Sequence, residues 1–207
     1  MEKLRVGIIG CGGIANGKHM PALRSQADKA DMVAFCDIVV ERAEKAAKEF
    51  GAPGAKVYEN YRELLEDGSI DVVHVCTPNR SHCEITVAAL ESGKHVMCEK
   101  PMAMNMDDAN EIIRRSEEKH VKVAACHQNR FNVAVQELRH AVEGGRFGKL
   151  SHGSIHVRWN RDRNYYDQAP WRGTWAQDGG CLMNQCIHGI DLLRWMRKEG
   201  MMQPFII

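Results

Sequence analysis

The sequence has almost no net charge and no long apolar run. Its 28 Lys and Arg residues against 27 Asp and Glu residues give a formal net charge of +1, and the isoelectric point is about 7.6. No basic cluster is longer than a pair such as Arg114–Arg115, so nothing in the composition favours nucleic acid or an anionic membrane. No apolar stretch approaches the roughly 20 residues of a membrane span. We therefore expect neither kind of partner.

The eight cysteines include no C-x-x-C pair. Several stand inside apolar, strand-like segments, as buried thiols do. We therefore expect reduced cysteines and no bound metal, structural zinc included. Because Met1–Lys3 leads directly into an apolar run, we also expect no signal peptide and a cytoplasmic location.

What the sequence does contain is a glycine-rich turn directly after its first apolar run. Leu4–Ile9 has the length of a strand, and the pattern Gly10-x-Gly12-x-x-Ala15 follows it. In a dinucleotide site the first glycine permits a tight turn, and the second lets the backbone approach the pyrophosphate. The small third residue allows close helix packing, and the helix N-terminus faces the phosphates. Alone, this pattern is also typical of an ordinary glycine turn.

Asp37 strengthens the dinucleotide interpretation. It lies 22 residues past Ala15 and ends a second apolar run, Met32–Cys36. A carboxylate there can accept hydrogen bonds from the ribose hydroxyls and would repel a 2′-phosphate. The spacing therefore predicts NAD as the cofactor.

Strand and helix signals alternate up to about residue 150. The expected strands are Leu4–Ile9, Met32–Cys36, Asp71–Cys76, His95–Cys98 and Val121–Cys126; the expected helices are Glu41–Phe50, Asn60–Glu66 with Asn60 as its cap, Ile85–Ser92 and Asp107–Glu118. Such alternation predicts right-handed βαβ units and an α/β, doubly wound parallel sheet. We assign this domain to residues 1–126.

The pattern changes in the remainder, residues 127–207, which we expect to hold a connecting helix and the first part of an α+β domain. Leu150–Trp159 alternates like a strand with one exposed face. A loop rich in arginine and aromatic residues follows, and Leu182–Met196 is predicted to be one amphipathic helix. On that helix Asn184, His188 and Asp191 would share a face, because they are spaced by four and three residues.

Residues 4 to about 197 resemble the glucose-fructose oxidoreductase / inositol dehydrogenase / rhizopine-catabolism (Gfo/Idh/MocA) family. The motifs that carry the resemblance are, in order, Gly10–Ala15, Thr77–Asn79, Gly93–Val96, Glu99–Pro101, Arg130–Phe131, Phe147–Lys149 and Asp178–Asp191. The resemblance implies a Rossmann domain and then a domain whose open sheet carries the substrate and often builds a homo-oligomer. It implies hydride transfer between NAD(P) and a hydroxyl of a sugar, sugar acid, nucleotide sugar or cyclitol. It also implies a cis bond between Lys100 and Pro101, and a C-terminal domain that is truncated here.

The chemistry also follows from the residues. Lys100 stands at the end of a strand, on the edge where open α/β sheets bind ligands. Its ammonium group would hydrogen-bond the reacting hydroxyl and stabilise developing alkoxide charge. His188 can titrate near neutrality and is the natural general base. Asn184 cannot take a proton, but it can hydrogen-bond the substrate or orient the imidazole. These three are the predicted catalytic residues.

The full set of predicted site residues is larger. The predicted cofactor contacts are Gly10, Gly12, Gly13, Ile14, Asp37, Thr77, Asn79, His82, Glu99 and Lys100. The predicted substrate contacts are Lys100, Arg158, Tyr166, Trp171, Arg172, Asp178, Asn184 and His188.

The sequence departs from its family at three positions near the predicted base His188. Many members carry aspartate in place of Asn184 and glycine in place of Cys181 and Cys186. The loop from Arg161 to Trp175 looks most like a branch that oxidises the 3-hydroxyl of UDP-N-acetylglucosaminuronate, since arginines and aromatics suit an acidic, stacked substrate. The alternative is that Trp171 and Trp175 belong to the core of the second domain, and for Trp175 we favour it.

Three classes of function stay open on the sequence. The leading one is an NAD-dependent sugar or cyclitol dehydrogenase. The second is a glycosidase of the same fold that oxidises its substrate only transiently and yields no net NADH. The third is a non-catalytic NAD-binding sensor or a truncated remnant. The residues after Arg197 include a proline and three final apolar residues, from which we expect a truncated chain that self-associates through residues 150–207 and turns over poorly.

Overall fold

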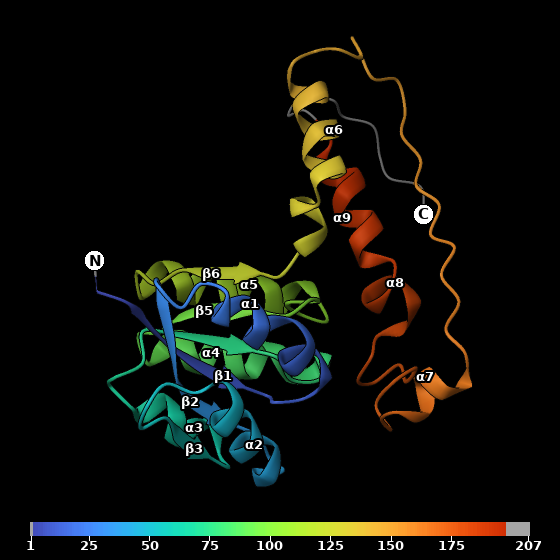
Figure 1. The fold of residues 1–207 in the computed structure, drawn as a ribbon. Coiled ribbons are helices and arrows are strands. Elements are labelled where there is room, and N and C mark those ends of the chain that lie inside the picture. Colours follow the sequence, from blue (N-terminus) through green and yellow to red (C-terminus); the bar gives the residue numbers. More distant parts are fainter. Residues whose placement is uncertain (1, 198–207) are drawn as a thin grey trace.

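The structure is a computed structural model that describes residues 2–197. Six parallel strands form one sheet in the order β3-β2-β1-β4-β5-β6 (Figure 1). The strands are β1 (Leu4–Ile9), β2 (Ala30–Cys36), β3 (Lys56–Tyr58), β4 (Val72–Val75), β5 (His95–Cys98) and β6 (Val123–Ala125). This order is that of the Rossmann fold and confirms the predicted doubly wound sheet. The tail at residues 198–207, on which the expected truncation rests, lies outside the described residues.

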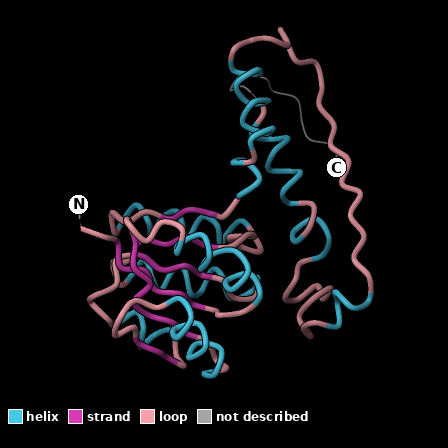
Figure 2. Tube along the Cα trace, viewed as in Figure 1, coloured by secondary structure: helices cyan, strands magenta, loops and turns pink. Residues whose placement is uncertain are grey.

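Helices cover both faces of the sheet (Figure 2). They are a π-helical turn η1 (Ala15–His19) continued by α1 (Met20–Arg24), then α2 (Val40–Phe50), α3 (Tyr61–Glu66), α4 (His82–Glu91) and α5 (Met106–Glu118). Alternation along β1 separates two cores, because Ile8 packs with the buried residues of α1 and α2 whereas Ile9 packs with those of α3 to α5. In the described part of the chain no helix is long and apolar enough to cross a membrane.

The edge strand β3 was not predicted. It is only three residues long and pairs with Ala34–Cys36 of β2. A run this short shows no alternation that separates a strand from a loop, and its pairing depends on a neighbour about 20 residues earlier. Tertiary pairing therefore creates the strand.

The predicted strand Leu150–Trp159 is wrong. After the connecting helix α6 (Val133–Glu143) the chain runs extended past α9 and pairs with no strand among residues 2–197 (Figure 2). The alternation is still used, because Ile155 and Val157 both face Gly189 of α9. A strand needs a partner for its backbone hydrogen bonds, and the described residues offer none.

The predicted helix Leu182–Met196 is also wrong, because it is divided into α8 (Gly180–Asn184) and α9 (Ile187–Trp195). The Cys181 carbonyl accepts hydrogen bonds from the N–H groups of both Gln185 and Cys186, so the backbone turns between the helices. Asn184 therefore does not share a helix face with His188 and Asp191. A last short helix, α7 (Arg163–Asp167), precedes α8.

Candidate active site

The glycine turn after β1 has the geometry that a dinucleotide needs. Gly10 has φ +91°, and a Cβ there would lie 2.8 Å from the backbone of Cys76, so no other residue fits without strain. A Cβ on Gly12 or Gly13 would meet no heavy atom within 4 Å. The space above these two glycines is open to a pyrophosphate, and this observation fits bound NAD. Ile14, the next predicted contact, is partly exposed at the start of the helix.

Asp37 stands beside this turn at the end of β2. One oxygen, Oδ2, accepts a hydrogen bond of 2.8 Å from the N–H of Cys11, and Oδ1 accepts one of 2.9 Å from Val39. The carboxylate is buried, whereas the following Ile38 is 87% exposed. Each carboxylate oxygen has a second acceptor site, so Asp37 is oriented by the backbone and still able to accept from a ribose.

Three further predicted cofactor residues follow β4. Thr77 begins the turn, and the Asn79 side chain donates to the backbone oxygen of Asp178 at 3.0 Å and to its Oδ1 at 3.3 Å. His82 is 1% exposed, and its ring nitrogens lie 2.7 Å and 2.8 Å from the carbonyls of Pro101 and Thr77. Asn79 thus joins the Rossmann domain to the second region. His82 braces two turns and leaves no ring nitrogen free for a ligand.

Glu99 belongs to a buried polar chain below Lys100. Its Oε1 lies 2.8 Å from His19 Nε2, and the other His19 nitrogen lies 3.0 Å from Nδ1 of His74. Its Oε2 accepts from the backbone N–H of Lys100 at 3.2 Å. The ligand atoms of His19, Glu99 and Cys126 lie within 4.8 Å of one another. In this structure His19 and Glu99 bond to each other, and the chain continues to His74 and to the Lys100 backbone.

Lys100 is directed at Asn184 across the junction of the two regions. Its Nζ donates to the backbone oxygen of Asn184 at 3.1 Å and to its Oδ1 at 3.2 Å. Burial lowers the pKa of Lys100, although the nearby carboxylates of Glu99 and Asp178 oppose the shift. The bond to Pro101 is cis, as the resemblance implied. The ammonium group is thus positioned by Asn184, and it is more acidic than that of an exposed lysine.

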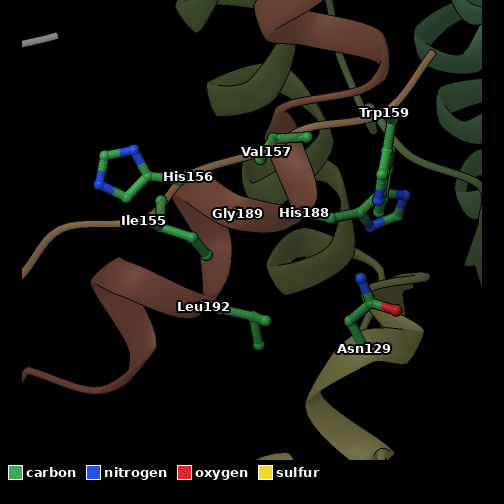
Figure 3. A pocket seen from close by; sticks show the side chains of 8 residues that line it. All are labelled: Asn129, Ile155, His156, Val157, Trp159, His188, Gly189 and Leu192. Atoms are coloured by element: carbon green, nitrogen blue, oxygen red, sulfur yellow. The ribbon is translucent and has the colours of Figure 1, made fainter.

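The positive charge of Lys100 acts on His188. Burial lowers the pKa of His188, and Lys100 and His127 lower it further, so the neutral imidazole is favoured. Its Nδ1 is buried and has no hydrogen-bond partner among residues 2–197. In Figure 3 the rings of His188 and Trp159 lie together, with centroids 6.4 Å apart. They line a hollow of about 150 Å³ with Asn129, Ile155, Val157 and Leu192 (Figure 3).

Asp178 connects the groups on the substrate side. Its Oδ1 accepts hydrogen bonds from the side chains of Asn79 and Asn184, and its Oδ2 accepts from Gly173 N–H at 2.7 Å. It is 3% exposed. Its carboxylate therefore connects Asn79, Gly173 and Asn184, and it positions Asn184 beside Lys100.

Arg172 is the charged side chain that the aromatic loop presents to the site. Its guanidinium carbon lies 4.3 Å from the ring centroid of Tyr165 and 4.9 Å from that of Trp171. Its Nε is buried without a hydrogen-bond partner in the described chain. Arg172 also lies near enough to lower the pKa of Lys100. A stacked arginine with an unused donor suits an acidic ligand.

The structure does not bring every predicted substrate residue to this point. Arg158 is exposed, and Tyr166 packs beside Gly173 while remaining 41% exposed. The core position that we favoured for Trp175 is wrong, since Trp175 is 84% exposed. Its ring lies beside Gly180, but no element of the described chain covers its outer face.

Two histidines of the site were missed in the sequence. His19 contacts Glu99 from 80 positions away, and its one signal is its place four residues past Ala15 on the helix after the glycine turn. His127 lies 3.7 Å from Asp191, whose carboxylate also accepts from Arg130. Asp191, which lies on α9 one turn after His188, thus pairs with Arg130 of the preceding segment.

Comparison with known proteins identifies the family. Residues 4–127 match the oxidoreductase family with an NAD-binding Rossmann fold, and residues 135–200 match the GFO/IDH/MocA C-terminal domain. The chain belongs to the Gfo/Idh/MocA family. This finding confirms the resemblance and the NAD cofactor class.

Relatives of this Gfo/Idh/MocA protein act on several sugars and cyclitols. It is 30% identical to myo-inositol 2-dehydrogenase of Thermotoga maritima over 98% of this chain and 57% of the relative. It is 37% identical to D-glucoside 3-dehydrogenase of Escherichia coli over 91% of this chain and 52% of the relative. The WlbA dehydrogenase of Bordetella pertussis, solved with NADH and UDP-GlcNAcA, aligns with a TM-score of 0.88 and 35% identity, covering 94% of this chain and 55% of that one. The chain thus spans about half the length of these relatives.

Proposed function

We propose that this chain supplies the cofactor site and the acid/base residues of an NAD-dependent dehydrogenase that oxidises a secondary hydroxyl of a sugar, sugar acid, nucleotide sugar or cyclitol. The observation that carries the proposal is the position of Lys100 and His188. Lys100 follows the end of β5, on the same edge of the parallel sheet as the glycine turn after β1, and its charge lowers the pKa of His188 on α9. Buried titratable groups whose pKa is shifted by burial together with a neighbouring charge are typical of active sites.

The residues divide the chemistry between them. The hydroxyl of the substrate lies within reach of the Lys100 ammonium group, which donates a hydrogen bond and stabilises negative charge on the oxygen. The neutral His188 accepts the hydroxyl proton, and the nearby positive charge of Lys100 then favours release of that proton to solvent. When bound, NAD+ accepts the hydride. Asn184 keeps Nζ directed at the reacting position and takes no proton itself.

Within this class we propose the 3-hydroxyl of a nucleotide-linked sugar acid, UDP-N-acetylglucosaminuronate, as the reacting group. The support is Arg172, whose guanidinium carbon lies over the rings of both Tyr165 and Trp171 and whose Nε has no hydrogen-bond partner among the described residues. Its charge also lowers the pKa of Lys100. A carboxylate or phosphate would pair with this guanidinium group. Structural neighbours were solved with NADH and UDP-GlcNAcA, which supports the same substrate class.

Isotope transfer tests this proposal. The protein in its full natural length is mixed with NAD+ and with UDP-N-acetylglucosaminuronate carrying deuterium at C3. We expect deuterium in the NADH that forms. Deuterium that stays in the sugar while NADH forms would exclude the 3-hydroxyl, and release of the nucleotide without net NADH would favour the glycosidase. A homo-oligomer of the full-length form and a cytoplasmic location stay predictions.

A further inference from the structure

Two cysteines meet at the junction of α8 and α9. The Sγ atoms of Cys181 and Cys186 lie 3.3 Å apart, and the backbone N–H of Cys186 donates to the Cys181 carbonyl at 2.9 Å. This backbone bond holds the two residues side by side. A disulfide needs its sulfurs about 2.05 Å apart, so the thiols are within a small side-chain movement of bonding distance.

Cys181 differs from the other cysteines in accessibility. It is exposed, whereas Cys186, Cys83 and Cys126 are half-buried and the remaining four are buried. Burial raises the pKa of the six thiols outside the pair, to about 12 for Cys11, Cys36, Cys98 and Cys126, to about 11 for Cys83, and well above the usual range for Cys76. Since the thiolate is the reactive form, these six are poor nucleophiles. The hydrogen bond to Cys181 raises the pKa of Cys186, so Cys186 keeps its proton while Cys181 faces solvent.

We propose that Cys181 and Cys186 are a redox modification site, which forms a reversible disulfide on exposure to a peroxide. The Cys181 thiolate attacks one peroxide oxygen, the O–O bond breaks, and a sulfenic acid and one water are formed after proton uptake. Cys186 Sγ then attacks the sulfenic sulfur, the S–O bond breaks, and the departing hydroxide leaves as a second water with the thiol proton. The two thiols lose two electrons and two protons, and the peroxide takes up both and is reduced to two waters. A small dithiol reverses the bond by exchange.

Asn184, which accepts hydrogen bonds from Lys100, lies between the two cysteines in the sequence. The loop closed by the disulfide contains Asn184, whose backbone and side-chain oxygens both accept from Lys100 Nζ. The glycine turn and Asp37 belong to a different part of the fold, at the ends of β1 and β2. The disulfide therefore forms in the substrate half of the site, and we expect NADH affinity to stay within twofold.

Peptide mass spectrometry tests the proposal on the complete chain. Trypsin releases residues 173–194 as one peptide that contains Cys181 and Cys186 and no other cysteine. The folded protein is treated with hydrogen peroxide, blocked with iodoacetamide and digested. We expect this peptide to lose the mass of two hydrogens and to take up no label. Dithiothreitol added after the peroxide and removed before iodoacetamide should restore labelling of both cysteines. The matched control Cys83→Ser keeps the pair and should behave like the wild type.

The variants Cys181→Ser and Cys186→Ser complete the test. With Cys181→Ser, we expect Cys186 to remain available for labelling after peroxide treatment. With Cys186→Ser, Cys181 should stop at the sulfenic acid or be oxidised further, because no resolving thiol is present. The proposal is overturned if peroxide converts wild-type Cys181 to a sulfinic acid while Cys186 still takes up label. It is also overturned if both thiols stay labelled, or if the bond forms between two chains.

Discussion

Replacing Gly12 with alanine tests the dinucleotide site where the backbone must approach its ligand. A Cβ on Gly12 would meet no heavy atom of the protein within 4 Å, and Gly12 does not have a positive φ. The substitution therefore leaves the folded protein unstrained. We expect its free energy of unfolding to stay within about 0.5 kcal/mol of the wild type.

The effect on the cofactor should be much larger. The added methyl group occupies the open space that the pyrophosphate needs, and overpacking a close contact costs about 1–3 kcal/mol. This corresponds to roughly 5- to 150-fold weaker NADH binding. Gly10→Ala should behave differently, because its Cβ would lie 2.8 Å from the Cys76 backbone at φ +91°. There we expect a loss of about 1–3 kcal/mol in the free energy of unfolding.

The assay combines NADH titration by fluorescence with urea unfolding of each variant. Gly17→Ala is the matched control, since its Cβ also meets nothing within 4 Å and it lies on the exposed side of the helix. This control should bind NADH as the wild type does. If folded Gly12→Ala also keeps wild-type affinity, the pyrophosphate does not pass over this turn and the reasoning is refuted.

Other predictions concern selectivity, the substrate and pH. Because Asp37 would repel a 2′-phosphate and Ile38 offers no positive charge, NADH should bind at least about tenfold more tightly than NADPH; equal affinities by titration would contradict this role. Arg172→Ala should raise KM for a nucleotide-sugar acid by about tenfold or more with little change in kcat, and an unchanged KM would remove Arg172 from the substrate site. Burial and the neighbouring His19 lower the pKa of His74 to about 3, so folding disfavours its protonated form. The contribution of neutral His74 to the free energy of unfolding should therefore be fully present above about pH 6.5 and be lost as the pH drops toward 3. The free energy of unfolding of His74→Gln, measured with urea, should depend less on pH, and an identical pH dependence would contradict the assignment.

The sequence predicted those parts of the fold that local pattern determines. The strand Leu4–Ile9, the turn at Gly10 and the cap Asn60 depend on neighbours within a few residues, and all three are found. The strand Leu150–Trp159 failed because a strand exists only with a partner, which alternation cannot reveal. The predicted burial of Trp175 failed for a related reason, since burial depends on which distant residues cover a side chain.

The site shows the same division. The sequence named both Lys100 and Asn184 as catalytic residues, but it did not predict that the Lys100 ammonium group would donate to Asn184 across 84 positions. Nor did it predict the chain from Glu99 through His19 to His74, because three histidine and glutamate positions on separate elements carry no common spacing. The break between α8 and α9 was hidden by a helical pattern that continues across it.

The central claim is that Lys100 and His188 act on a sugar hydroxyl beside bound NAD. The most direct test is NADH formation by the full-length protein with a panel of nucleotide sugars, sugar acids and cyclitols, run in parallel for wild type, Lys100→Ala and His188→Ala. We expect NADH with at least one substrate, a fall in turnover of roughly 10²–10⁴-fold in each variant, and unchanged NADH binding. Near-normal turnover of His188→Ala across pH 6 to 9, or of Lys100→Ala in a protein that still binds NADH, would contradict the account.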